Sequence, residues 1–126
     1  MFMLHSGIDL VEVKRLAEIN PAIRQRFLQR VFTPLELADA NDSNIHLAGR
    51  FAAKEAAAKA LGTGIGKVSW KDIEIQRGPN GEPVLHLYGS AAALSEKLGL
   101  FTWSISISHT QTHAVAMAVA CGPVET

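Results

Sequence analysis

The sequence has little cysteine, no excess of either charge and no long apolar run. The single cysteine, Cys121, excludes an internal disulfide framework and a cysteine-based zinc site, and it fits a reducing compartment. Twelve basic residues balance twelve acidic residues, so a strongly basic nucleic-acid-binding protein is not expected. The longest strictly apolar run is residues 114–121, far short of the ~20 residues that a membrane helix needs. The first residues lack the basic start and the cleavage site of a signal peptide, so we expect a cytoplasmic protein without a membrane segment.

The composition is that of a folded globular chain. Apolar residues make up 48% of the sequence and charged residues 19%, which excludes a disordered protein. A chain of 126 residues is long enough to bury a core without disulfides or a structural metal. We therefore expect one domain that spans residues 1–126.

Local patterns predict both strands and helices. Apolar and polar residues alternate over 3–11, which predicts a strand with His5 and Asp9 on the face opposite the leucines. Helical stretches are predicted over 12–31 with a break near residues 20–21, and from 34 to about 41 after a capping box formed by Thr33 and Glu36. The remaining predicted elements are an alanine-rich helix over 44–61, paired strands over 72–76 and 83–88, a helix over 89–98, and a second hairpin over 103–109 and 113–121.

The last predicted strand is apolar on both faces. Val115, Met117 and Val119 lie on one face, and four alanines lie on the other. Such a strand needs cover on both sides, and we expect a helix on one side and another subunit on the second. The predicted fold is therefore α+β, with a small, mostly antiparallel sheet packed with the long alanine-rich helix and shorter helices.

Two carboxylates are candidate metal ligands. Asp9 lies at the end of the first strand, and Glu55 lies in the middle of the alanine-rich helix. Taken alone, Asp9 reads as a solvated strand-end carboxylate, and Glu55 as half of an ordinary surface pair with Lys59 four residues on. Helical spacing, however, places Glu55 and Lys59 on one stripe that points toward the glycine loop 62–66. A carboxylate pair suits a hard cation such as Mg²⁺, which usually takes its other ligands from substrate phosphates.

Cations beside that stripe suggest a phosphate-rich ligand. Arg50 and Lys54 form a neighbouring helical stripe, and Gly62 and Gly64 allow a close approach of the backbone. The loop follows a helix and lacks the Gly-Lys-Ser/Thr ending, so it is neither a Walker loop nor a dinucleotide fingerprint. A plain helix end remains the alternative for this loop.

Two further groups of residues carry candidate binding roles. His109 and Thr110 end the strand over 103–109 and could donate hydrogen bonds to a phosphate, although a surface histidine is the simpler reading. The basic stretch 14–30 includes Lys14, Arg15 and Arg24. It is either a solvated helix face or a patch that docks an acidic partner.

In this order, the motifs resemble the bacterial holo-[acyl-carrier-protein] synthases of the phosphopantetheinyl transferase superfamily. The resemblance is carried by GIDLVEVKR at 7–15, by AGRFAAKEA at 48–56 running on to KALGTGIG at 59–66, and by SISHT at 106–110. It extends over roughly residues 7–119, and the middle stretch is its most specific part. One departure is His5, where many members have glycine; this leaves open whether His5 reaches the site.

The resemblance implies transfer of the 4′-phosphopantetheinyl arm of coenzyme A to a serine of apo acyl carrier protein, with release of adenosine 3′,5′-bisphosphate. It implies that Asp9 and Glu55 hold Mg²⁺ and that Lys59 contacts the phosphates, so these three are the expected catalytic residues. The implied coenzyme A contacts are Arg50, Lys59, Gly62, Gly64, His109 and Thr110, and we expect Lys54 to join them from its place on the stripe with Arg50. The resemblance further implies that Arg15 engages the carrier and that the chain forms a homotrimer with sites between subunits. Lys14 and Arg24 of the same basic stretch are expected to take part in the carrier contact.

Three other functions stay open from the residues alone. A non-catalytic module that binds coenzyme A or a nucleotide would keep the cations but would not need both carboxylates. A metal-dependent phosphohydrolase would need a further carboxylate cluster, which the sequence lacks. A structural trimer without a ligand would leave the charged set from Arg50 to Lys59 unexplained except as surface charge.

Overall fold

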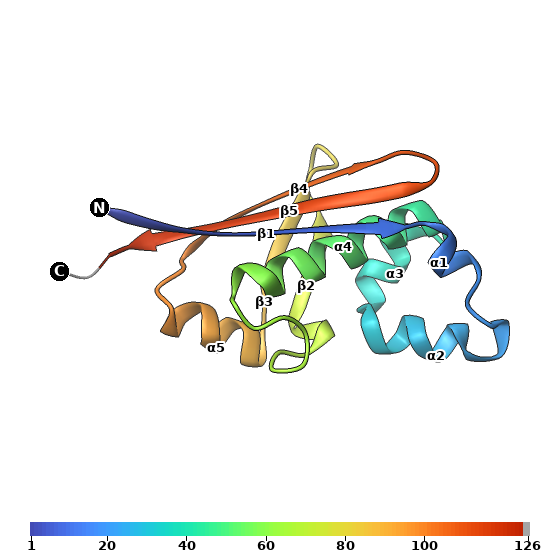
Figure 1. Cartoon of the computed structure of the whole chain (residues 1–126). Helices are drawn as coiled ribbons and strands as arrows, with labels where there is room; N and C mark the ends of the chain where they lie inside the picture. Colours follow the sequence, from blue (N-terminus) through green and yellow to red (C-terminus); the bar gives the residue numbers. More distant parts are fainter. Residues whose placement is uncertain (125–126) are drawn as a thin grey trace.

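The computed structural model describes residues 1–124. In chain order the elements are β1 (Phe2–Glu12), α1 (Lys14–Ala17), α2 (Pro21–Val31), α3 (Pro34–Ala40), α4 (Asn44–Ala60), a short 3-10 helix η1 (Trp70–Asp72), β2 (Ile73–Arg77), β3 (Pro83–Leu87), α5 (Gly89–Lys97), β4 (Thr102–His109) and β5 (His113–Pro123) (Figure 1). The predicted α+β class is confirmed. Most predicted elements are present with bounds shifted by at most two residues, but α1 ends three residues before the predicted break, and η1 was not predicted. Within residues 1–124, no helix is both long and apolar enough to cross a membrane.

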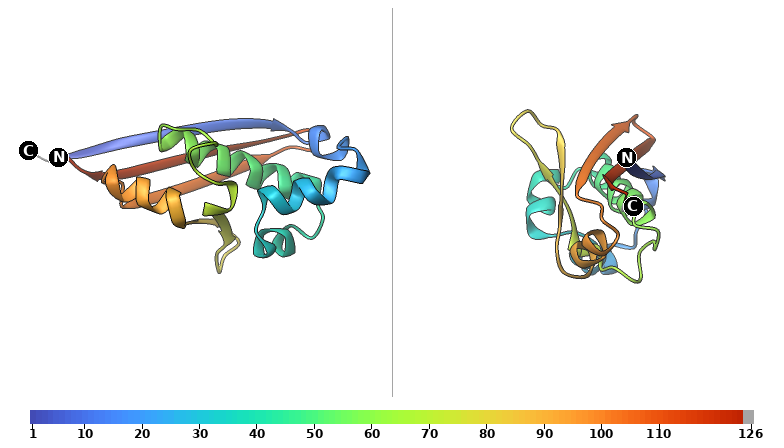
Figure 2. Two further views of the ribbon diagram at one scale, coloured as in Figure 1. Left: turned by 90° about the horizontal axis from the view of Figure 1, so that it is seen from below. Right: turned by 90° about the vertical axis from the view of Figure 1, so that its left-hand side faces the viewer.

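The strands form two antiparallel sheets rather than the one that the sequence predicted. β1, β5 and β4 form a three-stranded sheet with β5 in the centre, and β2 pairs with β3 in a separate hairpin (Figure 2). Helix α4 contacts β1 and β5 of the first sheet and also β2 of the hairpin. Its alanines are buried almost all round, from Ala48 to Ala60. A helix with so much of its surface buried needs cover from more than one direction, and the two sheets provide it.

Local signals in the sequence set the helix ends. Thr33 and Glu36 form the predicted capping box at the start of α3. Asn20 caps α2 by accepting a hydrogen bond from the amide of Ala22, which places the predicted break at Pro21. Ser43 caps α4, and the chain leaves that helix through Gly62 at a φ of +83°. These caps fix where α4, which carries most of the charged motif, begins and ends.

The central strand β5 has one covered face and one open face. Its four alanines, at positions 114, 116, 118 and 120, are buried against α4 as predicted. The opposite face carries Met117 beside Ile8 and Val115 beside Leu10 of β1. On this face Phe2, Leu4, Ile8, Leu10 and Met117 are between 45% and 74% exposed. The open side of the sheet is therefore a continuous apolar surface.

Candidate functional site

The first part of the site is the seam where β1 crosses the C-terminal half of α4. A side chain on Gly7 would overlap the carbonyl oxygen of Ala56, so glycine allows the strand to lie directly on the helix. The Lys59 ammonium lies 3.1 Å from Oδ1 of Asp9 and donates a hydrogen bond of 2.9 Å to the carbonyl of Ile8. The strand and the helix thus bring the predicted residues Asp9 and Lys59 into contact.

Glu55 lies on the same seam, one turn before Lys59. Partial burial raises the pKa of the Glu55 carboxyl, the negative charge of Asp9 raises it further, and Lys59 opposes both effects. Among residues 1–124, Glu55 has no ion-pair partner, because Lys59 is engaged with Asp9. The structure therefore brings two carboxylates close enough for the charge of Asp9 to act on Glu55, with Lys59 beside them.

This carboxylate pair fits a hard divalent cation. The two carboxylates come from different elements, β1 and α4, and the negative charge of Asp9 disfavours ionisation of Glu55. In the described part of the chain, no cluster of three or more histidine, cysteine or acidic side chains is present. Mg²⁺ needs no such cluster, since it is commonly held by one or two carboxylates together with substrate phosphates. Asp9 and Glu55 would be its protein ligands.

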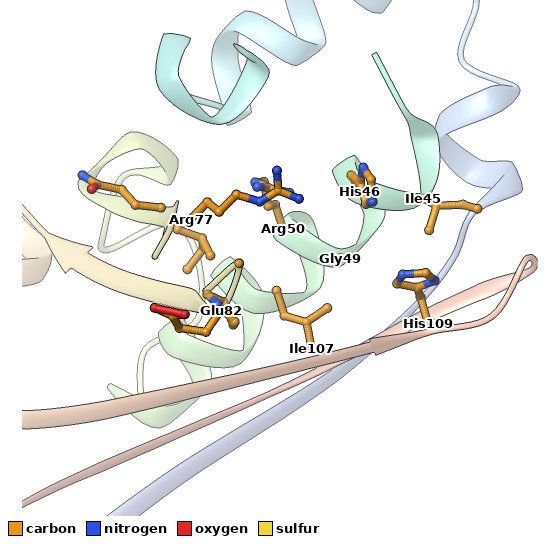
Figure 3. Close-up of a pocket in the computed structure, with 12 residues that line it drawn as sticks. Ile45, His46, Gly49, Arg50, Arg77, Glu82, Ile107 and His109 are labelled. Atoms are coloured by element: carbon orange, nitrogen blue, oxygen red, sulfur yellow. The ribbon is translucent and has the colours of Figure 1, made fainter. Parts of the chain in front are cut away.

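The second part of the site is a pocket between α4, the β2–β3 hairpin and β4. It has a volume of about 260 Å³. Arg50 and Arg77 lie side by side at one end, and His46 and His109 lie together at the other (Figure 3). The two imidazole rings are 6.1 Å apart and nearly perpendicular. Two arginine and two histidine side chains therefore line one pocket, which the acidic Glu82 also lines.

Arg50 is the more constrained of the two arginines. Its Nε atom is buried, and no residue of the described chain accepts a hydrogen bond from it. Burial lowers the pKa of Arg50 and the nearby Arg77 adds to this, while the charges of Asp39 and Glu36 raise it. A buried donor without a partner, beside a second arginine, suits an anion with several oxygens, such as a phosphate.

Sequence reasoning missed two residues of this pocket. His46 lies one helical turn before Arg50, so the spacing i, i+4 could have placed both on one face. Arg77 ends β2 just before the hairpin turn, and no local pattern connects it with α4. Its position depends on how the hairpin packs, which a sequence pattern does not report.

Three predicted contacts differ in the structure. Lys54 was expected to bind the cofactor, but its side chain is 0% exposed and forms a 2.7 Å ion pair with Glu36, with further hydrogen bonds to the carbonyls of Trp70 and Ile73. All three ammonium donors are used, so this prediction is wrong. Arg24 was expected to bind the partner. Its side chain instead donates hydrogen bonds to the carbonyl of Leu16 and to the side chain of Asn44, which links α1 to the start of α4, so Arg24 is not part of the predicted partner surface.

Thr110 is the third residue whose predicted contact differs in the structure. Its hydroxyl accepts hydrogen bonds from the amides of Thr112 and His113 in the β4–β5 turn, and Thr110 does not line the pocket. The structure brings His109 to the pocket and leaves Thr110 in the turn.

The other predicted residues remain accessible. Gly62 and Gly64 have φ values of +83° and +65° with open space around them, so the loop after α4 presents bare backbone. Lys14 and Arg15 are exposed on α1. Arg15 also borders an apolar pocket lined by Val11, Leu16, Ile19, Ile23, Phe27 and Phe51.

The two parts of the site lie on opposite sides of α4. The carboxylate pair is at the β1 edge of the three-stranded sheet, and the arginine pocket is at the β4 edge. Glu55 and Arg50 are five residues apart, which separates them by about 140° around the helix. One chain therefore presents two half-sites rather than one continuous cleft.

Comparisons with known proteins agree on one family. The family model described as the 4′-phosphopantetheinyl transferase superfamily matches residues 6–119. The chain is 47% identical over 120 residues to the holo-[acyl-carrier-protein] synthase of Carboxydothermus hydrogenoformans, covering 93% of this chain and 97% of the relative. It is 43% identical over 116 residues to the enzyme of that name from Natranaerobius thermophilus, covering 90% and 93%.

A solved structure has the same fold. The Helicobacter pylori holo-[acyl-carrier-protein] synthase in complex with coenzyme A superposes with a TM-score of 0.83 at 34% identity, covering 91% of this chain and 98% of that chain. The similarity thus extends over both half-sites.

Proposed function

Since the chain belongs to the 4′-phosphopantetheinyl transferase superfamily, we propose that its two half-sites divide the binding of one coenzyme A molecule. The protein transfers the 4′-phosphopantetheinyl arm of coenzyme A to a serine of apo acyl carrier protein. Coenzyme A and the carrier protein are its substrates. The observation that carries the division is the placement of Asp9, Glu55 and Lys59 on one side of α4 and of Arg50 and Arg77 on the other.

The seam of β1 and α4 is the reaction centre. The carrier serine oxygen forms a bond to the β-phosphorus of coenzyme A, and the bond from that phosphorus to the bridging oxygen breaks, which releases adenosine 3′,5′-bisphosphate. Lys59 donates to the pyrophosphate oxygens and offsets the charge that develops on them. Glu55, one helical turn before Lys59 on the same seam, is the candidate to accept the serine proton. A Mg²⁺ ion held by Asp9 and Glu55 would supply charge neutralisation on the pyrophosphate.

The arginine pocket binds the 3′-phosphate of coenzyme A. Arg50 has an unpartnered buried donor there, and Arg77 lies beside it. His46 and His109 add ring nitrogens at the other end of the pocket. The glycine loop that begins at Gly62 presents backbone to the nucleotide without side-chain obstruction.

A homotrimer explains both the open sheet face and the divided site. The apolar side chains of β1 and β5 lie uncovered on one side of the sheet, and burial of such a surface strongly favours association. In a ring of three copies, the β1 edge of one subunit would face the β4 edge of the next. Each complete site would then combine the carboxylates of one copy with the arginine pocket of its neighbour.

Lys14 and Arg15 form the docking surface for the acidic carrier protein. Both lie exposed on α1, five and six residues beyond Asp9 of the reaction centre. The adjoining pocket lined by Ile23 and Phe27 would take an apolar side chain of the carrier. A charged rim beside an apolar pocket combines steering with affinity.

Residues 1–126 form the one transferase domain, and its location in the cytoplasm stays a prediction.

The test of this function is the intact mass of a purified apo acyl carrier protein after incubation with this protein, coenzyme A and Mg²⁺. We expect a gain of one phosphopantetheinyl group, which is absent when EDTA is added. Transfer that survives EDTA would remove the metal assignment. Coenzyme A binding by calorimetry without any transfer would favour the non-catalytic binding module instead.

A further inference from the structure

His5 occupies an unusual place at the seam between β1 and α4. It lies on the inward face of the strand, two residues before Gly7, and it is half-buried. Its Nδ1 atom lies 2.9 Å from the carbonyl oxygen of Ala60, the last residue of α4. A carbonyl only accepts hydrogen bonds, so Nδ1 carries the proton and donates it. The His5 side chain of β1 thus caps the C-terminal end of α4.

The cap completes the hydrogen bonding of the last turn of α4. The last four carbonyls of a helix have no partner within the helix. Here the amide of Leu61 donates to Ala57, those of Thr63 and Gly64 donate to Ala58, and that of Gly62 donates to Lys59. The chain that turns away through the glycine loop therefore satisfies three carbonyls. Within residues 1–124, the hydrogen bond to the fourth, that of Ala60, comes from His5.

The same histidine holds the strand in place beside the reaction centre. Gly7 lies against the backbone of α4 without a side chain that could anchor it. Beyond Gly7, the strand is fixed by the bonds from Lys59 to the carbonyl of Ile8 and to Asp9. Before Gly7, it is fixed by His5. Polar contacts of Lys59 on one side of the glycine and of His5 on the other therefore set how β1 and the end of α4 lie relative to each other.

We propose that His5 is a positioning residue for the transfer reaction, which fixes the end of α4 and thereby the start of the glycine loop 62–66 that receives the nucleotide. This inference rests on the proposed function for its consequence, but the anchoring itself does not depend on turnover. Without the cap, Ala60 would be left with an unpaired carbonyl and the loop would begin from a frayed turn. Part of the binding free energy of coenzyme A would then be used to order that turn, so the KM for coenzyme A rises while the rate of the chemical step is retained.

The test uses His5→Phe, which keeps a ring of similar volume but removes the donor, and His5→Asn, whose amide nitrogen can take the place of Nδ1. We expect His5→Phe to raise KM for coenzyme A about tenfold, the usual cost of one unpaired buried acceptor, with kcat changed by less than about twofold. His5→Asn should recover most of the wild-type KM. His86→Ala, which removes a half-buried histidine of β3 outside the site, is the control and should leave KM unchanged.

Amide hydrogen exchange of residues 61–64 gives a readout without coenzyme A. These amides should exchange faster in His5→Phe than in the wild type and at the wild-type rate in His5→Asn, while amides of β5 stay unaffected. Equal exchange and equal KM in all three proteins would overturn the proposal, and so would His5→Asn behaving like His5→Phe. If the wild type transfers no group, the proposed function fails, and the exchange rates still decide whether His5 anchors the loop.

Discussion

A Cβ atom on Gly7 would overlap the carbonyl oxygen of Ala56, so the first strand lies on the long helix with no space for a side chain between them. This contact sets the height of β1 above α4. Because Lys59 reaches Ile8 and Asp9 from the helix, that height also sets the geometry of the reaction centre.

Gly7→Ala is therefore expected to destabilise the protein by about 3 kcal/mol, at the upper end of the usual cost of overpacking, and to abolish transfer because β1 must move. Urea unfolding and the mass assay check this. Gly49→Ala is the matched comparison for stability alone, since its new methyl would meet a side-chain atom of Ile107 at 3.0 Å rather than backbone, and a helical alanine is intrinsically favourable. A stable and active Gly7→Ala protein would contradict the packing described for the seam.

Glu55→Gln should stabilise the metal-free protein and remove its response to Mg²⁺. The pKa of Glu55 is raised on folding, so its ionised form disfavours the folded state at pH 7 and a neutral side chain relieves that effect. The gain in Tm should shrink as pH falls toward the pKa of Glu55, where the wild-type carboxyl is itself protonated. Thermal unfolding with and without Mg²⁺ measures both effects, with the exposed Glu96→Gln as control. A Mg²⁺-dependent rise in Tm that persists in Glu55→Gln would sink the ligand assignment.

The buried pair of Glu36 and Lys54 should show strong coupling. Burial raises the pKa of Glu36 and lowers that of Lys54, yet the two groups are 2.7 Å apart and Glu36 also accepts from the amides of Thr33 and Ile75. Lys54→Met leaves a buried carboxylate without its cation and is expected to cost about 3–5 kcal/mol. The double variant Glu36→Gln with Lys54→Met should cost clearly less than the sum of the single changes. Additive costs in urea unfolding would show that the pair is not coupled.

Mixed oligomers test whether the site is shared. Asp9→Asn disables one half-site and Arg50→Gln the other, so each variant alone should be inactive. In equal mixtures refolded together, about a quarter of the sites should combine two intact halves if neighbouring subunits complete each other. The mass assay on the mixture measures the recovered activity, and sedimentation gives the oligomeric state. No recovery from a mixture shown to be trimeric would place both halves of a site in one chain.

Arg77→Gln should weaken the use of coenzyme A but hardly that of dephospho-coenzyme A, which lacks the 3′-phosphate. Loss of one charged hydrogen bond corresponds to about a tenfold or larger fall in kcat/KM for coenzyme A. The ratio of kcat/KM for the two substrates is the measurement, and Lys97→Gln on α5 is a control outside the pocket. An unchanged ratio would remove Arg77 from the phosphate site.

The sequence alone determined most local structure, because the signals that fix it lie within a few residues of each other. The capping box of Thr33 and Glu36, the break at Pro21 and the turn at Gly62 all act over one helical turn. Alternation over β1 also predicted that His5 and Asp9 share the face opposite the leucines, and the motif around Glu55 indicated the family and its chemistry; that this face is the one packed on α4 came from the structure.

Tertiary structure decided which charged side chains are free to bind and which are consumed by the fold. Lys54 and Lys59 differ little in sequence context, but Lys54 points between α4 and β2 and is buried against Glu36, while Lys59 points to β1 and stays accessible. Arg77 and His46 enter the arginine pocket only through the packing of the β2–β3 hairpin and β4 around α4. The division of the site between two sides of one helix likewise depends on long-range packing. A local pattern reports the period of a helix or strand, but the partner on each face is set by contacts between residues distant in the chain.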